Sequence, residues 1–138
     1  MSATRRLAQL SIEGWQLESG EARHDAGPDT FDIPPRAARE CLRVGQAVRL
    51  LFQIGTENEA GAVDVGVERM WAVVAGRIGE LYIGILENQP VTIEAGTGLE
   101  AGTEFVFRAE HVIDIADPPR DYLIEKYGRR LNLDLPSR

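Results

Sequence analysis

The side chains with the most reactive chemistry in this sequence are two histidines and one cysteine. A thiol and an imidazole can form a nucleophilic pair in which the imidazole accepts the thiol proton, so Cys41 with His24 or His111 is one option. Neither histidine has a second ligand-type neighbour at helical or strand spacing, except ordinary acids. We therefore predict a buried or half-buried Cys41, a solvated or capping His111, no catalytic residues and no metal site.

The glycine-rich stretches predict turns rather than a phosphate-binding loop. Residues 76–79 (GRIG) and 96–98 (GTG) are not followed by a helix carrying the lysine of a phosphate loop. No serine lies in a Gly-x-Ser-x-Gly frame, the arrangement that exposes the nucleophile of many hydrolases. We therefore predict no cofactor, and the sequence favours a non-enzymatic function.

The run Glu-Arg-Met-Trp that begins at Glu68 offers the clearest candidate binding site. Alternation along a strand places Arg69 and Trp71 on one face, and arginine and tryptophan are frequent interface anchors. One hypothesis is a groove with Trp71 as its floor and with Glu68 and Arg69 at its rim. A related hypothesis is an enzymatic or small-molecule pocket, lined by Arg69, Trp71, Asn88 and His111. The structural alternative keeps Trp71 in the core, with Arg69 stacked on it or paired with a glutamate across the sheet.

Acidic residues outnumber basic ones, and the excess lies in the middle of the chain. The 138 residues include 22 Asp and Glu against 15 Lys and Arg, a net charge of −7. Residues 50–107 hold two bases against nine acids, whereas residues 1–49 hold seven of each. This charge steers a basic protein partner towards the chain and disfavours nucleic acid. The loop expected at residues 55–66 holds three acids and no base: Glu57, Glu59 and Asp64.

Period-two alternation of apolar residues predicts strands through the middle of the chain. The clearest spans residues 46–54, where valine, leucine, phenylalanine and isoleucine share one face. An apolar strand at residues 67–75 is expected at the centre of the sheet with both faces covered. Shorter strands are expected at residues 7–17 with a bend at Gly14, and at 81–86, 91–94, 104–108 and 112–115.

Two short helices complete the prediction. Prolines open a helix at residues 35–42, a second helix begins after Asp117 and ends at Gly128, and residues 18–30 predict a loop. We expect an α+β, mostly-β domain: a curved antiparallel sheet or small barrel, with a short helix before the second strand and a C-terminal helix. A single domain is expected to span residues 1–138, comprising an N-terminal strand and loop (1–30), a core (31–118) and the C-terminal helix and tail (119–138).

Five runs of the sequence carry a likeness to a known family. They are FDIP at 31–34, LRVGQAVRLLF at 42–52, ERMWAV at 68–73, YIGILENQP at 82–90 and FVFRAEHVIDI at 105–115. Together they resemble small bacterial domains catalogued as domain of unknown function 2314 and its relatives. The resemblance implies a small β-rich fold, a bacterial source and no catalytic residues. The loop at residues 55–66 is long for this family, and residues 1–30 and 119–138 have no clear counterpart.

Three functions follow as hypotheses. The first is a non-enzymatic binding module that engages a basic protein, with an immunity-like role because similar domains occur around toxin–immunity loci. The second is the enzymatic or small-molecule pocket described above, and the third is a homodimer formed through a sheet edge. No run of 18 apolar residues is present, so we expect no membrane span. The polar start of the chain lacks the apolar stretch of a secretory signal, which predicts a cytoplasmic protein.

Overall fold

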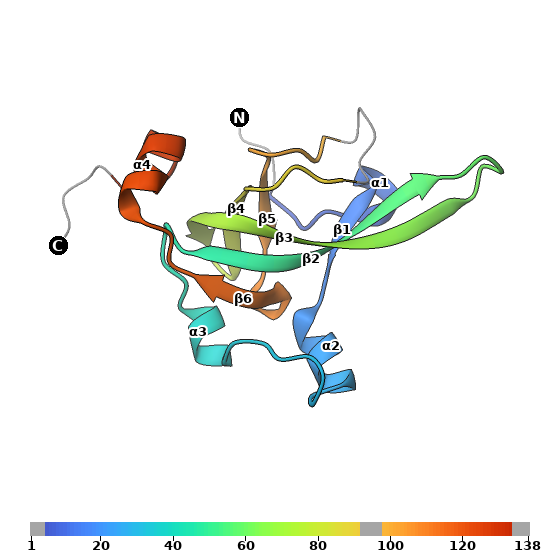
Figure 1. Ribbon diagram of the computed structural model, residues 1–138, viewed down its shortest axis with the longest axis horizontal. Helices are drawn as coiled ribbons and strands as arrows, with labels where there is room; N and C mark the ends of the chain where they lie inside the picture. The colour runs from blue at the N-terminus through green and yellow to red at the C-terminus, as the bar shows by residue number, and fades with distance from the viewer. Residues whose placement is uncertain (1–4, 92–97, 134–138) are drawn as a thin grey trace.

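The computed structural model describes residues 5–91 and 98–133, and its main feature is a curled antiparallel sheet (Figure 1). Alternating apolar residues form its central strands, because one face of each can then be buried. The strands are β1 (Trp15–Glu18), β2 (Ala47–Glu57), β3 (Val63–Ile78), β4 (Leu81–Leu86), β5 (Glu104–Phe107) and β6 (Val112–Ala116).

The strand order explains how the sheet curls. Neighbouring strands pair as β1–β2–β3–β4–β5, and β6 returns to pair with β2. Trp15 of β1 lies opposite Ile54, and Ala116 of β6 lies opposite Ala47, so β1 and β6 follow one another along the same edge of β2. The result is a half-barrel, which confirms the predicted mostly-β fold with a curved antiparallel sheet.

The inner face of the sheet holds the main core. Trp15, Phe52 and Phe105 pack with ring centroids 5.5–5.9 Å apart, and Tyr82 stacks on Phe107 at 5.3 Å. Offset and edge-on arrangements of this kind stabilise aromatic clusters beyond their buried area. The curvature of the sheet brings these rings from β1, β2, β4 and β5 together.

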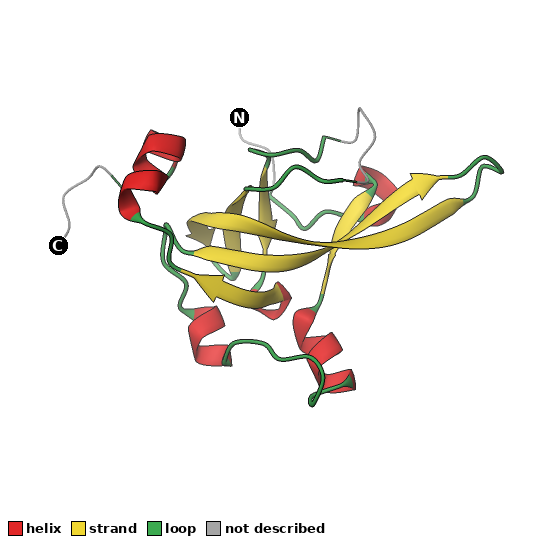
Figure 2. Cartoon of the chain, viewed as in Figure 1, coloured by secondary structure: helices red, strands yellow, loops and turns green. Residues whose placement is uncertain are grey.

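Short helices surround the sheet, as Figure 2 shows. Helix α4 packs on the outer face, where Leu123 and Tyr127 meet Val73 of β3 and Ile85 of β4 in a second cluster. None of the helices within residues 5–91 and 98–133 is long and apolar enough to cross a lipid bilayer. The helices are α1 (Leu10–Glu13), α2 (Gly20–Ala26), α3 (Arg36–Glu40) and α4 (Arg120–Tyr127), with the 3-10 helices η1 (Ala109–His111) and η2 (Gly128–Arg130).

The predicted helices before the second strand and at the C-terminal end are confirmed, whereas the N-terminal strand is shorter than expected. Residues 10–13 form the single turn of α1 instead of extended strand, because the Glu13 carboxylate accepts a hydrogen bond from Gln9 N at 2.6 Å. Gly14 ends that turn at a φ of +86°, in the left-handed region that glycine adopts without strain. Strand β1 starts only at Trp15.

The loop expected at residues 18–30 is in large part helix α2. The Ser19 hydroxyl accepts a hydrogen bond from Ala22 N at 3.1 Å, which caps the first turn. The sequence did not predict this helix because Gly20 lies at its start, and glycine is a weak helix former. Its role is close approach, because a Cβ at Gly20 would lie 2.6 Å from Cγ2 of Ile113 in β6.

The predicted loop at residues 55–66 is mostly strand. β2 continues to Glu57 and β3 begins at Val63, so the connection is residues 58–62 alone. The strand expected at residues 67–75 is covered on both faces at Ala72, Val73 and Val74, whereas Val67 and Arg69 near its start are exposed. Of the strand expected at residues 91–94, residues 92–94 lie outside the described part of the chain, and Val91 is a bend.

Candidate functional site

Glu68 and Arg69 lie on opposite faces of β3. The alternation of the strand separates them, and the backbone N of Val91 donates to both Glu68 carboxylate oxygens at 3.1 Å. Glu68 thereby ties β3 to the segment after β4. Arg69 is exposed on the outer face, the same face as Trp71, as the sequence predicted.

Trp71 is half-buried on the outer face and belongs to neither core cluster. Asn88 holds its backbone, since Asn88 Oδ1 accepts a hydrogen bond from Trp71 N at 2.6 Å. Beside it, Glu87 N donates to Trp71 O at 2.9 Å. Asn88 therefore extends the pairing of β3 with the chain after β4, and through it the backbone of Trp71 is fixed.

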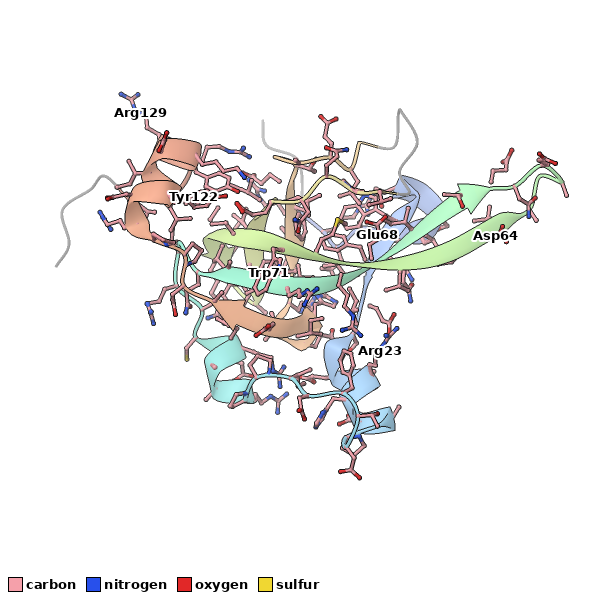
Figure 3. The ribbon with its side chains drawn as sticks, viewed as in Figure 1. Arg23, Asp64, Glu68, Trp71, Tyr122 and Arg129 are labelled. Carbon is pink, nitrogen blue, oxygen red and sulfur yellow. The ribbon has the colours of Figure 1, made fainter. Side chains whose placement is uncertain are left out.

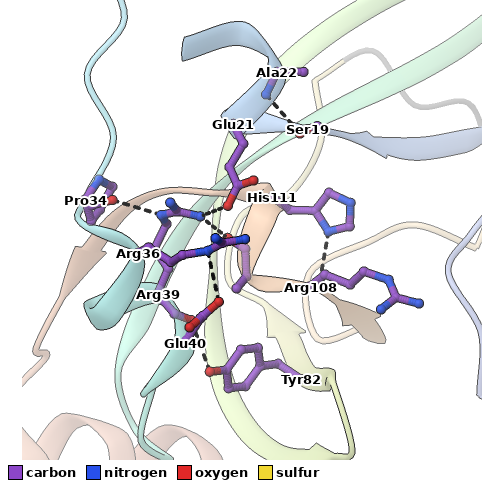
Figure 4. Close-up of polar contacts among 11 residues, drawn as sticks. Ser19, Glu21, Ala22, Pro34, Arg36, Arg39, Glu40, Tyr82, Arg108 and His111 are labelled. Carbon is purple, nitrogen blue, oxygen red and sulfur yellow. Dashed lines mark hydrogen bonds and ion pairs between the residues drawn. The ribbon is translucent and has the colours of Figure 1, made fainter. Parts of the chain in front are cut away.

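His111 lies in a buried cluster between η1, α2 and α3, with different neighbours from Trp71 (Figure 4). Its Nδ1 accepts a hydrogen bond from Arg108 N at 2.9 Å, which caps η1. Burial, with a smaller contribution from the charge of Arg108, lowers the pKa of His111 to about 4, and Glu110 and Glu21 oppose the shift. The structure thus brings Arg69, Trp71 and Asn88 into one region and places His111 in another, as a capping imidazole.

Arg39 organises the cluster around His111 and was not singled out from the sequence. Its Nε donates to Pro34 O at 2.8 Å, and its Nη1 donates to Ala109 O at 3.1 Å. The same Nη1 pairs with Glu21 Oε2 at 2.5 Å, a contact that lowers the pKa of Glu21. The Tyr82 hydroxyl donates to the backbone O of Arg39 at 3.1 Å. One buried guanidinium therefore joins α2, α3 and η1.

An open apolar hollow of about 400 Å³ lies beside Trp71. Trp71 forms one wall, and Tyr122 of α4 forms another (Figure 3). Apolar hollows with a few polar groups at the rim are common binding sites for ligands or for side chains of a partner. The other residues around it are Ala47, Glu87, Ala116, Pro118 and Pro119.

Glu87 holds α4 in the position that forms this hollow. Its carboxylate accepts hydrogen bonds from the hydroxyls of Tyr122, at 3.0 Å, and of Tyr127. Lys126 Nζ lies 3.3 Å from Oε2. Burial and this carboxylate raise the pKa of the Tyr127 hydroxyl, which stays protonated and donating.

Replacement of Glu87 with glutamine is expected to lower the free energy of unfolding by about 1–2 kcal/mol, because charge-assisted hydrogen bonds weaken when the charge is removed. Urea unfolding measures the change. The control is Glu125→Gln, which removes an exposed acid of α4. It should change the free energy of unfolding by less than about 0.5 kcal/mol. Equal effects of the two substitutions would show that Glu87 does not hold α4.

Two arginines on the outer face stack on aromatic rings. The guanidinium of Arg49 lies 5.8 Å from the Trp71 ring centre, in the row where β2 pairs with β3. The guanidinium of Arg69 lies 5.5 Å from the Phe31 ring, which also carries Arg23 at 5.5 Å. The alternation of residues along the strand predicted that Arg49 faces away from the apolar side chains. The sequence contained no signal for its contact with Trp71.

A two-stranded arm, defined as residues 55–66, extends the ends of β2 and β3 beyond the body of the protein (Figure 1). Pairing of β1 with β2 stops at Ile54, and pairing of β4 with β3 starts at Ala72. The tip is ordered by Asn58, whose Oδ1 accepts hydrogen bonds from the backbone N of Ala60 and Ala62 at 2.9 and 3.0 Å. All three predicted acids of the partner face are exposed on this arm: Glu57, Glu59 and Asp64.

Cys41 is exposed, which corrects the expectation of a buried or half-buried thiol. It follows the last residue of α3, where the short helix ends before it can bury that position. The described contacts of His24 and His111 include none with Cys41. Among residues 5–91 and 98–133 no group of three or more His, Cys, Asp or Glu side chains is placed to hold a metal ion.

With this geometry in view, the chain was compared with known proteins. No protein family, no curated protein and no solved structure matches it. The resemblance to the domain of unknown function 2314 family stays a prediction from sequence.

Proposed function

We propose that the protein is a non-enzymatic binding module that engages a basic protein partner through the arm. The observation that carries the proposal is the charge of the arm, which presents three exposed carboxylates and no base. Charged surfaces steer association and select partners of opposite sign. The immunity-like role expected from the family resemblance is one form of this function, in which the basic partner is a toxin.

The apolar side chains of the arm support the proposal. Val63 and Val65 are 61% and 50% exposed on the outer face of the hairpin, next to Glu57 in the same row as Val63. Exposed apolar side chains beside charged ones are typical of interaction surfaces. A partner with basic residues around an apolar patch would contact both kinds of side chain at once.

The test is affinity capture with three forms of the full chain: wild type, an arm-neutral variant (Glu57→Gln, Glu59→Gln, Asp64→Asn) and a matched control. The control removes three exposed acids outside the arm (Asp25→Asn, Glu100→Gln, Glu125→Gln), so both variants have the same net charge. We expect the wild type and the control to capture the same basic protein from the source cells. The arm-neutral variant should associate with it about tenfold more slowly at low salt.

Two outcomes would contradict the proposal. Capture that the arm-neutral variant retains at full rate would show that the arm is not the binding element. Capture of acidic proteins alone would show that the charge of the arm does not select the partner.

A second copy of the chain is the competing partner, because an unpaired strand edge can pair with another chain. Within the described residues, β3 has no strand partner on its second edge before Ala72. Sedimentation at several concentrations distinguishes the two, since edge pairing gives a mass that rises with concentration and persists in high salt.

A further inference from the structure

The outer sheet face carries two guanidiniums that have no acidic partner among the described residues. Within residues 5–91 and 98–133, most arginines make a hydrogen bond or an ion pair with another group. Arg49, Arg69 and Arg129 make neither. In a chain with a net charge of −7, two unpaired cations in neighbouring rows of one sheet face are unexpected.

The two arginines lie in neighbouring rows on the same face of the sheet. Arg49 lies opposite Trp71, and Arg69 lies opposite Leu51 in the next row of the same face. Each is stacked on an aromatic ring, Arg49 on Trp71 and Arg69 on Phe31. Stacking uses the flat face of a guanidinium and leaves its N–H edge available for a carboxylate.

Arg49 has an unmet hydrogen-bonding requirement. Its Nε is buried and has no acceptor, and buried donors in native proteins are nearly always paired. Asp114 faces Arg49 from β6, but no ion pair joins them, and Asp114 Oδ1 accepts instead from Ile115 N at 2.9 Å. Because Arg49 as a whole is only half-buried, a ligand from outside the chain can reach its guanidinium at the Nη groups and not at the covered Nε.

The apolar hollow continues the site on the other side of Trp71. Trp71 contacts Arg49 and also lines the hollow with Tyr122, Pro118 and Pro119. A ligand that contacts both the arginines and the hollow therefore needs carboxylates beside a large apolar side chain. Long polyanions are disfavoured by the net charge of the chain, whereas a short acidic segment presents few charges.

We propose that the outer face binds an acidic peptide segment, with carboxylates on Arg49 and Arg69 and an apolar side chain in the hollow between Trp71 and Tyr122. This binding surface is separate from the acidic arm. A module with both surfaces would hold a basic protein at the arm and an acidic segment on the sheet.

The experiment is an NMR titration of ¹⁵N-labelled full chain with the blocked peptide acetyl-Asp-Glu-Leu-Asp-Glu-amide. The chain has two tryptophans, so two indole N–H signals report on it. Trp15 is 6% exposed in the core and serves as an internal reference for the fold. We expect the Trp71 indole to shift with the acidic peptide and to stay unchanged with its Asn-Gln-Leu-Asn-Gln counterpart.

Three single variants assign the contacts. Arg49→Gln and Arg69→Gln should each weaken peptide binding about tenfold, the loss expected for one charged hydrogen-bonded partner. Arg129→Gln removes the same charge from η2, at an arginine that is likewise without an ion pair, and should leave the affinity unchanged. Because Arg69 is exposed, its variant keeps the test valid if Arg49→Gln disturbs the Trp15 signal.

Three results would overturn the proposal. They are an unmoved Trp71 signal, equal affinity for the neutral peptide, and equal losses in Arg69→Gln and Arg129→Gln. Self-association abolished both by Arg69→Gln and by the arm-neutral variant would assign the site to the arm of a second copy instead. The arm-neutral variant should bind the peptide normally, so failure of the arm proposal and failure of this one are distinguishable.

Discussion

Replacing Arg39 with methionine is expected to lower the free energy of unfolding by about 3 kcal/mol. Methionine keeps the packing of the aliphatic stem but removes the guanidinium. Arg39 is 5% exposed, and its loss leaves Pro34 O and Ala109 O without their donor and Glu21 without its ion pair. Leaving a buried donor or acceptor unpaired costs more free energy than the hydrogen bond itself contributes to stability. Urea unfolding followed by tryptophan fluorescence measures the loss.

The control for this substitution lies on the same helix. Arg36 pairs with Glu40 at 3.1 Å, but both side chains are largely exposed, at 72% and 50%. Exposed ion pairs contribute little, so Arg36→Met should change the free energy of unfolding by less than about 0.5 kcal/mol. Equal losses in the two variants would mean that Arg39 stabilises the cluster through general charge and not through its contacts.

Acidification is expected to destabilise the protein through His111. Its pKa is about 4 in the folded protein, because the ring is buried, and about 6.5 when the chain is unfolded. The neutral ring is therefore favoured by folding, so this stabilisation is complete above pH 6.5 and is lost as the pH falls towards 4. The total loss is about 3 kcal/mol over that window. The hydrogen bond from Arg108 N to Nδ1 is also lost on protonation, because a protonated Nδ1 cannot accept.

The measurement is the free energy of unfolding at pH 7, 6, 5 and 4.5. The His111→Gln variant should have a lower free energy of unfolding than the wild type at pH 7. Its free energy of unfolding should also fall less steeply as the pH is lowered, because up to one proton fewer is taken up on unfolding. Glu21, whose pKa is lowered by its bond to Arg39, loses its contribution only below about pH 4.5, outside this range. Identical slopes in wild type and His111→Gln would refute the assignment.

The sheet was predictable because its strands follow local rules. Val48, Leu50, Phe52 and Ile54 alternate with outward residues, and all four are buried on the inner face. The N-terminal elements were not predictable in the same way. Glycine is needed at position 20 because a Cβ there would clash with Ile113, 93 positions further along the chain, and such a long-range constraint leaves no local pattern.

The candidate site was predictable only in part for a related reason. Strand alternation correctly placed Arg69 with Trp71 and Arg49 on the outer face, since one strand period decides that. The separation of His111 from Trp71 depends on the curl of the whole sheet. The hollow depends on α4, whose Tyr122 reaches Glu87 from 35 positions away. Neither arrangement is encoded by the spacing of neighbouring residues.

The continuity of β3 bears on the entropy of binding. This strand runs without a break from Val63 in the arm through Trp71 to Ile78, and β2 accompanies it from Glu57 to Ala47. No linker separates the tip from the body, so its carboxylates do not sample the positions that a tethered loop would sample. A partner that bound the arm as proposed would immobilise little that was free, and the free energy lost in ordering the arm would be small.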